Sequence, residues 1–522
     1  MKRKLLTLLS LTMLLTSAVY GEVAVKLNGA AIDGANAVIE QDRTLVPLRG
    51  VFEAMGYEVS WDAETKTATL KNSENTITAR PNESFFTLNG EQIDLDVPSR
   101  IIDERMYLHL RGISEASDYI VKWDPETKTV SINKKQEDEP IEISEGEISV
   151  EDAKALTNAQ FIILNKTIEE RKGENVLISP DSVASAFGML SNGAEGQTLK
   201  EIEDVIAGGL NRNKLNDLLY SLNTRMSQSK DAHFHFANSL WARNDGRAEF
   251  APRFVEVAQK YYSAGVFTEP FDASTVEKVN GWVSENTNGM IKKIIKEFNG
   301  NQVMCLINAL SFEGEWAVEY SEDDIKEDGE FTNVKGEKEE TPMLYSTENG
   351  CFKLNGGVGF KKSYKGGEFS YVAILPPENM GADEYALSIK GSDFIDALSK
   401  LDYDPDVYVK IPEYKYDFDT EMSDTLQALG MTSAFNGGDF TSLVTENSQS
   451  VEISSVIHKT HIEVDRKGTK AAAATAITME TSAIAPEYRN EVYIYLDRPF
   501  FYAIVDNKTN IPVFVGTVNS VK

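Results

Sequence analysis

The stretch HKTHIEVDRKGTKAAAATA, from His458 to Ala476, joins a strand pattern to a run of small residues. The alanines after Gly468 favour a helix by propensity. Side chains this small would also allow a loop to slide into a gap between two existing strands. In that extended form, alternation predicts a buried set: Thr469, Ala471, Ala473 and Thr475. Lys470 would then face solvent, and no proline in the run removes a backbone donor.

A large mixed unit surrounds this stretch and covers residues 151–522. Helical periodicity comes first, in ALTNAQFIILNKTIEER at 155–171. Strand-like runs dominate later, in EFSYVAILP at 368–376 and PVFVGTV at 512–518. Helices followed by strands, rather than a strict alternation of the two, predict an α+β fold.

An internal repeat precedes this unit. One copy runs from Asp42 to Leu70 and the other from Asp103 to Ile132, and each predicts a short strand, a helix and a hairpin. Arginine and tryptophan recur 62 residues apart in the two copies: Arg49 and Trp61, then Arg111 and Trp123. The repeat therefore predicts a small α+β domain over residues 22–135.

Two further segments have a composition of their own. Residues 1–21 begin with three basic residues, continue with an apolar run from Leu5 to Leu15 and end in small residues. This pattern predicts a secretory signal peptide rather than a membrane anchor. Residues 136–150 are acidic and lack helical periodicity, so we expect an extended, solvated linker. The sequence thus predicts a secreted protein that is extracellular or associated with the cell surface.

The composition argues against several classes of function. With 82 acidic and 52 basic residues, the net charge of −30 disfavours a nucleic-acid partner and favours a soluble monomer. No G-x-S-x-G, H-E-x-x-H or phosphate-loop motif occurs, and no other stretch is apolar enough to span a membrane. Ser179 and His458 suggest a nucleophile and its base, but no third group follows from spacing. We therefore expect no enzymatic activity, no cofactor and no metal.

Four residues leave alternatives open. His233 and His235 lie on one face of a predicted strand. They could form a metal-binding pair or be ordinary strand residues, and we favour the second interpretation. Cys305 and Cys351 could pair in a secreted chain. Two free or buried thiols are the simpler interpretation, because a domain of this size does not need a disulfide.

Five ordered stretches of residues 151–522 resemble the serpin family. They are NVLISPDSVASAFGMLSNGAEGQTLKEI at 175–202, INALSFEGEW at 307–316, YVAILPPEN at 371–379, the stretch 458–476 and IYLDRPFF at 494–501. The first resembles the family's buried helix B, the second a central-sheet strand, the fourth the strand and hinge before the reactive loop, and the last the C-terminal signature. The resemblance implies the serpin fold: a large central β-sheet, helices and an exposed reactive loop.

This resemblance implies a suicide-substrate inhibitor of serine endopeptidases rather than an enzyme. In that mechanism a protease cuts the loop, forms its acyl-enzyme, and is trapped covalently when the cut loop enters the central sheet as a new strand. About ten new backbone hydrogen bonds, at roughly 1 kcal/mol each, would make insertion downhill and leave the uncut protein metastable. The alternatives are a non-inhibitory serpin, which binds or transports a ligand, and a cell-surface binding protein that acts through its repeats.

The resemblance also assigns family roles to single residues. The hinge comprises Gly468, Thr469, Ala471, Ala472, Ala473 and Ala474. The polar shutter cluster beneath the sheet comprises Ser179, Ser182, Asn308 and His458. The breach, where insertion begins, comprises Trp316, Glu413 and Arg466. Many family members place a lysine against a glutamate at the breach, and here the two charges are exchanged.

Family spacing places the attacked bond 14 residues after Gly468, between Ser482 and Ala483, and we allow any bond from Met479 to Ala485. Most residues in this window are small, and it contains no arginine or lysine. A trypsin-like target needs a cation for its acidic pocket, so that class is disfavoured. We therefore expect an elastase-like or subtilisin-like protease as the partner.

The repeats at residues 24–133 resemble the small domain named after the N-terminal domain of copper amine oxidases. The resemblance does not imply copper, because His109 is the only histidine in the region and a metal site normally needs several ligands. Attachment to a cell-wall or surface component and a role as a spacer are equally good interpretations of residues 22–135.

Overall fold

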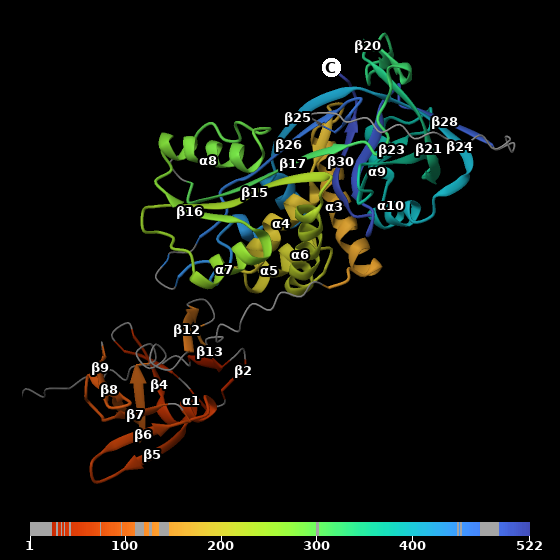
Figure 1. Ribbon diagram of the computed structural model, residues 1–522. Coiled ribbons are helices and arrows are strands. Elements are labelled where there is room, and N and C mark those ends of the chain that lie inside the picture. Colours follow the sequence, from red (N-terminus) through yellow and green to blue (C-terminus); the bar gives the residue numbers. More distant parts are fainter. Residues whose placement is uncertain are drawn as a thin grey trace, which may run out of the picture. The chain divides into compact units, whose positions relative to one another are not determined.

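The computed structural model divides into two compact units, residues 1–140 and 141–522 (Figure 1). It describes residues 23–134 and 146–522 apart from the internal positions 28–29, 33, 36, 41–42, 74, 96, 110–118, 125–127, 299–301, 446–447, 449–450 and 470–489. The expected signal peptide, most of the expected linker and the bond between Ser482 and Ala483 lie outside the described residues, as do the hinge alanines Ala471–Ala474.

The N-terminal unit is built from the predicted repeat. The first copy forms β4 (Arg43–Pro47), α1 (Leu48–Ala54), β5 (Glu58–Asp62) and β6 (Thr67–Lys71). The second copy forms β11 (Arg105–His109), β12 (Tyr119–Asp124) and β13 (Thr129–Lys134). The strand and hairpin of both copies and the helix of the first are therefore confirmed. The segment where the second helix is expected, 110–118, lies outside the described residues.

Three small sheets complete this unit. The other strands are β1 (Ala24–Leu27), β2 (Ala30–Ala31), β3 (Val38–Glu40), β7 (Thr76–Ala79), β8 (Phe85–Leu88), β9 (Glu91–Asp94) and β10 (Arg100–Ile102). The sheet orders are β12-β13-β1-β2, β10-β11-β4-β3 and β5-β6-β7-β8-β9. Phe52 of α1 and Leu70 of β6 are fully buried in the shared core, as their periodic spacing in the sequence requires.

Nine α-helices are described in the C-terminal unit: α3 (Val150–Glu170), α4 (Pro180–Ser191), α5 (Gly196–Ile206), α6 (Arg212–Gln228), α7 (Pro252–Tyr262), α8 (Ala273–Asn286), α9 (Ala382–Ser388), α10 (Gly391–Leu398) and α11 (Ser423–Ala428). Every residue of α4 is buried. Ser179 begins this helix because its Oγ accepts a hydrogen bond from the backbone N–H of Ser182 at 3.2 Å, and Pro180 follows where a missing N–H costs nothing.

The larger sheet of this unit runs in the order β14-β30-β29-β23-β22-β21-β24-β28. These strands are β14 (Val176–Ile178), β30 (Pro512–Val518), β29 (Phe500–Asp506), β23 (Phe369–Leu375), β22 (Gly357–Ser363), β21 (Met343–Leu354), β24 (Asp402–Pro412) and β28 (Glu491–Tyr495). The short β18 (Ile325–Lys326) pairs with β21, and β19 (Glu330–Thr332) pairs with β20 (Lys338–Glu340). Among the described strands β28 pairs with β24 alone, so it lies at an edge of the sheet.

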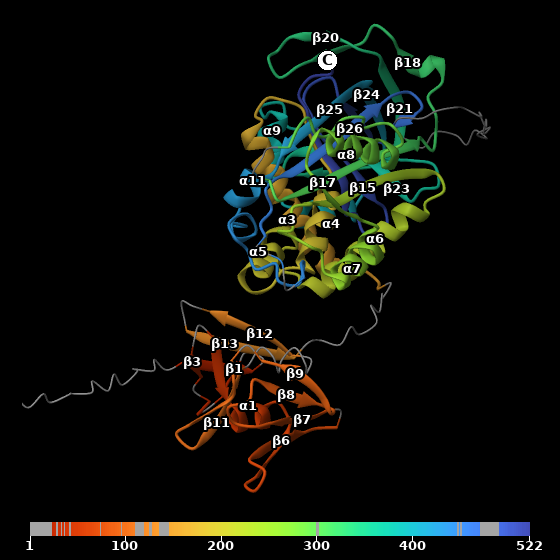
Figure 2. The ribbon, with the colours of Figure 1, turned by 90° about the vertical axis from the view of Figure 1, so that its left-hand side faces the viewer.

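The second sheet has six strands in the order β16-β15-β17-β27-β26-β25. These are β16 (Gly265–Glu269), β15 (Ala232–Arg243), β17 (Met304–Glu315), β27 (Gly468–Thr469), β26 (Val456–Val464) and β25 (Tyr414–Glu421). Alternate residues of β17 serve two cores: Cys305 and Ile307 pack with α8, whereas Leu306 and Leu310 pack in the main core with α4. The sheet is therefore covered on both faces (Figures 1 and 2), and the α+β prediction is confirmed.

One boundary differs from the expectation. We expected the solvated linker to extend through residue 150, but Val150 is the first residue of α3. Ser149 caps this helix by accepting a hydrogen bond from the N–H of Asp152 at 3.0 Å, and Ile148 packs against the core. The chain is attached to the C-terminal unit from Gly146, whose carbonyl accepts a hydrogen bond from Ser221. Capping and apolar contact therefore shorten the expected linker at its C-terminal end.

Cys305 lies on β17 and Cys351 on β21, in different sheets, and both are buried free thiols. His233 and His235 lie on β15, as the strand interpretation expects. Among the described helices, none combines the length and the apolar character that crossing a bilayer requires.

Candidate functional site

The central feature of the six-stranded sheet is the junction between β17 and β26. These two strands pair directly, in parallel, over residues 306–310 and 456–460. Further along, β27 lies between them and pairs antiparallel with both: Gly314 and Glu315 lie opposite Thr469 and Gly468, and Val464 lies opposite Thr469. The first two hinge residues therefore already form a short strand inside the sheet.

The sequence at the start of the hinge matches the space available to it. A Cβ on Gly468 would lie 2.1 Å from the carbonyl oxygen of Gly314 and 2.8 Å from the Cα of Glu315, so only glycine fits there. Thr469 is 1% exposed, and its Oγ1 lies 2.6 Å from the hydroxyl of Tyr364. Its burial agrees with the face that alternation assigns to it.

The shutter residues meet beneath the region where β17 and β26 still pair. Strand register places Asn238 of β15 opposite Asn308 of β17, and Asn308 opposite His458 of β26. The Nδ2 group of Asn308 donates to the carbonyl of Ser182 and to Oδ1 of Asn238, each at 2.6 Å. Asn308 thus ties its own strand to α4 and to the neighbouring strand.

His458 closes the cluster as a neutral ring. Its Nε2 accepts a hydrogen bond from the backbone N–H of Ser179 at 3.1 Å, so Nδ1 carries the proton and donates to Oδ1 of Asn308 at 2.7 Å. Complete burial lowers the pKa of His458 to about 3. Because Nε2 contacts the backbone of Ser179 and not its hydroxyl, the geometry provides no nucleophile and base.

Two polar atoms of the cluster are left without partners. Ser182 Oγ and Asn238 Nδ2 are buried and have no hydrogen-bond partner among the described residues. Separating β17 from β26 has to break the bond between Asn308 and His458. Asn308 contacts the residues of both unpaired groups, through the carbonyl of Ser182 and Oδ1 of Asn238.

The breach is held by an aromatic stack and a turn. The ring of Trp316 is fully buried and stacks on Tyr364, with 4.8 Å between centroids and 8° between planes. Trp316 also binds the turn that leads into the hinge, because its Nε1 donates to the carbonyl of Asp465 and its backbone N–H to that of Lys467, each at 2.9 Å. Tyr364 in turn contacts Thr469, so the stack touches the point where insertion would continue.

The exchanged charges at the breach form an ion pair. Arg466 Nε lies 2.9 Å from Oε1 of Glu413, and the backbone N–H of Arg466 donates to the same oxygen at 3.1 Å. Glu327 adds a second contact at 3.0 Å from Nη1 of Arg466. The guanidinium therefore fixes the turn after β26 between two carboxylates.

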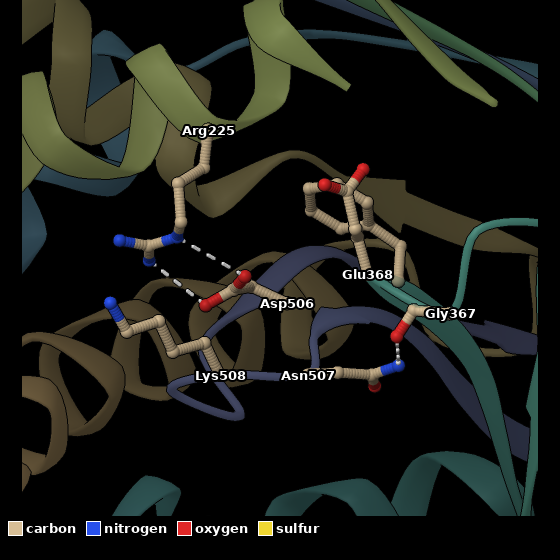
Figure 3. Close-up of a pocket in the computed structure, with 7 residues that line it drawn as sticks. Arg225, Gly367, Glu368, Asp506, Asn507 and Lys508 are labelled. Atoms are coloured by element: carbon tan, nitrogen blue, oxygen red, sulfur yellow. Dashed lines mark hydrogen bonds and ion pairs between the residues drawn. The ribbon is translucent and has the colours of Figure 1, made fainter. Parts of the chain in front are cut away.

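A charged cluster that sequence reasoning missed lies next to the shutter. Asp181, one residue before Ser182 in α4, is fully buried, and neither of its carboxyl oxygens has a hydrogen-bond partner among the described residues. Burial raises the pKa of Asp181 to about 7, while the charge of Arg225 opposes that rise. Arg225 of α6 pairs with Asp506 at 2.9 Å at the edge of an open cavity of about 360 Å³ (Figure 3). The one sequence feature that pointed to this cluster is a charged residue, Asp181, in a helix whose other residues are also buried.

Other contributors were missed because they depend on strand register. Asn238, Tyr364 and Glu327 contact predicted site residues from distant parts of the chain. An asparagine within the apolar strand pattern of β15 was the only local signal for any of them.

Comparison with known proteins agrees with this geometry. The family model described as serpin (serine protease inhibitor) matches residues 154–521, and the copper amine oxidase N-terminal domain model matches residues 26–132. An uncharacterized serpin-like protein of Methanosarcina mazei is 28% identical, over 66% of this chain and 81% of its own length. Serpin B3 of Homo sapiens is also 28% identical, over 70% of this chain and 98% of its own.

A solved structure extends the match to the fold. The crystal structure of the thermophilic serpin tengpin in its native state is 35% identical in sequence, with a TM-score of 0.67. The alignment covers 72% of this chain and 96% of that chain. Together with the family model, which spans most of the sequence, this match shows that the chain belongs to the serpin family and carries a unit of the copper amine oxidase N-terminal type in front.

Proposed function

We propose that this protein is a suicide-substrate inhibitor of a serine protease and acts by inserting its cut loop between β17 and β26. The observation that supports this most strongly is β27, because Gly468 and Thr469 already pair with β17, and Thr469 pairs with β26 as well. The small residues that follow in the sequence suit the same narrow gap. A loop with this start is ready to continue inward once cleavage releases its other end.

The sheet offers a physical reason for insertion to be downhill. β17 and β26 share one parallel ladder over residues 306–310 and 456–460. A strand continuing from β27 would replace it with two antiparallel ladders, which pair slightly more favourably per residue. The resistance to opening comes from the Asn308–His458 bond and the contacts of the breach. On this proposal the uncut protein is held by kinetics and the inserted form is the more stable one.

We further propose that the protein is secreted after removal of residues 1–21 and that its reactive bond joins Ser482 to Ala483. The small residues of this window suit an elastase-like or subtilisin-like protease. Cleavage there releases a fragment that starts at Ala483 and ends at Lys522, and mass spectrometry identifies it directly. Rapid inhibition of trypsin with cleavage after Arg489 would overturn this assignment.

Residues 22–135 would then attach the inhibitor to a cell-wall or surface component, or serve as a spacer. Full inhibition by residues 146–522 alone would place that activity in the C-terminal unit. Binding of cell-wall material by residues 22–135 alone would favour attachment. If residues 146–522 do not inhibit and residues 22–135 do not bind cell-wall material, this division of roles between the two units is contradicted.

The experiment that tests the proposed function mixes the full-length protein with subtilisin, elastase or trypsin. We expect a complex with subtilisin or elastase that survives denaturing electrophoresis, and none with trypsin. The control is the same protease with its active-site serine blocked, which cannot form an acyl-enzyme and should give no such complex. Cleavage of the loop by all three proteases without any stable complex would instead identify a non-inhibitory serpin.

A further inference from the structure

Strands β21, β24 and β28 lie together at one edge of the larger sheet (Figure 1), and tyrosines lie on the outer side of all three. Register places Tyr408 opposite Tyr493 and Lys410 opposite Tyr495 on β24 and β28, and Tyr345 of β21 lies opposite Lys410. We call these five residues the tyrosine face. Their strand neighbours Val407, Val409 and Ile494 are buried in the core, so alternation places the five on the outer side of the sheet, where Tyr408 and Lys410 are partly covered.

Three of the four rings of the tyrosine face are exposed, and the fourth, Tyr408, is half-buried. Tyr493 is 55% exposed, and Tyr345 and Tyr495 are 37% and 36% exposed. Tyr408 and Tyr493 stack with centroids 5.3 Å apart, and Tyr493 meets Tyr495 edge-on at 5.7 Å. Single exposed apolar side chains need no explanation, but a contiguous ordered patch marks an interaction site. Rings held on paired strands lose little freedom when a partner binds.

An acidic border gives this surface a charge preference. Asp402, Asp404 and Asp406 share the outward side of β24 with Tyr408, and Glu491 lies opposite Asp406 on β28. The one cation of the face, Lys410, is paired with Asp497 at 2.5 Å. Aromatic rings beside carboxylates fit arginine and lysine side chains, which stack on the rings and pair with the acids.

The tyrosine face is also within reach of the bond that a protease would attack. β28 begins at Glu491, nine residues after Ser482, and nine extended residues span at most about 30 Å. A specific protein interface takes about 20–30 residues from each side. A protease bound at that bond can therefore contact β28 as well as the loop.

We propose that the tyrosine face is a second contact surface for the target protease, recognised through arginine or lysine side chains beside the protease's active-site cleft. This proposal rests on the proposed inhibitory function. Its role is to speed the first encounter, because ordered rings and complementary charge raise association rates before any bond is cut. Specificity for one protease would then depend on this surface as well as on the residue at the attacked bond.

The test compares second-order rates of inhibition of subtilisin and of elastase by full-length variants. Replacing both Tyr493 and Tyr495 with alanine should slow inhibition of at least one protease by about tenfold or more, without changing the stoichiometry. Tyr403→Ala is the matched control, since Tyr403 is 63% exposed on β24 but faces away from the set Asp402, Asp404 and Asp406. Glu491→Gln should weaken the salt dependence of the same rate.

The outcomes separate this proposal from the proposed function. One outcome is that the double variant and Glu491→Gln both form stable complexes with both proteases at the parental rate. That result would overturn the second contact surface and leave the inhibitory function standing. A parent that forms no stable complex with any protease would overturn the inhibitory function and this inference with it. An equal slowing by Tyr403→Ala would show that the effect is not specific to the tyrosine face, which also overturns the proposal.

Discussion

Replacing Thr469 with arginine should convert the protein from an inhibitor into a substrate. Thr469 is 1% exposed between β17 and β26, and its hydroxyl bonds with Tyr364 at 2.6 Å. The substitution removes a buried hydrogen bond worth about 1 kcal/mol. It also buries a guanidinium beside Tyr364 and Val464, neither of which can neutralise its charge, and this costs several kcal/mol more.

The size of this cost decides the outcome of each encounter. An acyl-enzyme either is trapped by insertion or is hydrolysed and released. In the uncut protein the two-residue β27 can leave the sheet and expose the arginine, whereas an inserted loop has to bury it. A cost of about 3 kcal/mol on insertion then shifts that choice by more than about 100-fold. Thr469→Arg should therefore be cleaved at the parental rate while the stable complex falls below detection. Titration of protease activity and denaturing electrophoresis measure the two products. Thr469→Ser, which keeps the hydroxyl, should still inhibit, whereas parental stoichiometry in Thr469→Arg would refute insertion through this gap.

Reversing the charge of either Glu413 or Arg466 should speed spontaneous insertion or polymerisation, and reversing both should restore parental behaviour; additive effects would show that the pair is not coupled. Acid should destabilise the native state through His458, because its pKa falls from 6.5 to about 3 on burial. The loss begins below about pH 6.5 and reaches about 2 kcal/mol at pH 5. His458→Gln should make the thermal midpoint less dependent on pH between about pH 6.5 and 4, whereas His233→Gln, at an exposed position, should leave that dependence unchanged. Equal slopes of midpoint against pH in the parent and in His458→Gln would contradict this assignment. Asp181→Asn should raise the thermal midpoint at about pH 8 and much less at about pH 4. Burial raises the pKa of Asp181 to about 7, so its charged form costs stability as the pH rises. Unchanged midpoints in this variant would argue against that cost.

Much of the fold follows from local patterns in the sequence. The strand-like runs at 368–376 and 512–518 predict β23 and β30, and the helical segment at 155–171 predicts α3. The repeat predicts the strands and hairpins of both copies in the N-terminal unit. These features depend on near neighbours along the chain, so the sequence carries them directly.

The rest of the site depends on contacts between distant segments. The bond between Asn308 and His458 joins residues 150 positions apart, and Asn238 enters the cluster only because β15 pairs with β17 in one register. The family resemblance supplied Asn308 and His458, whereas the sequence offers for Asn238 only its place as an asparagine within an apolar strand pattern. The burial of Asp181 and of the Lys362–Glu348 ion pair is likewise set by packing, since both stretches read as ordinary charged positions in the sequence.

The central claim is that the cut loop becomes a new strand between β17 and β26, and the thermal midpoint of the cleaved protein tests it most directly. Loop cleavage by a trace of protease, followed by removal of that protease, leaves the cleaved form free to insert. About ten new backbone hydrogen bonds at roughly 1 kcal/mol each, with about 2 °C per kcal/mol for a large domain, predict a midpoint about 20 °C above that of the intact protein. A cleaved form that melts at or below the midpoint of the intact protein would contradict the account.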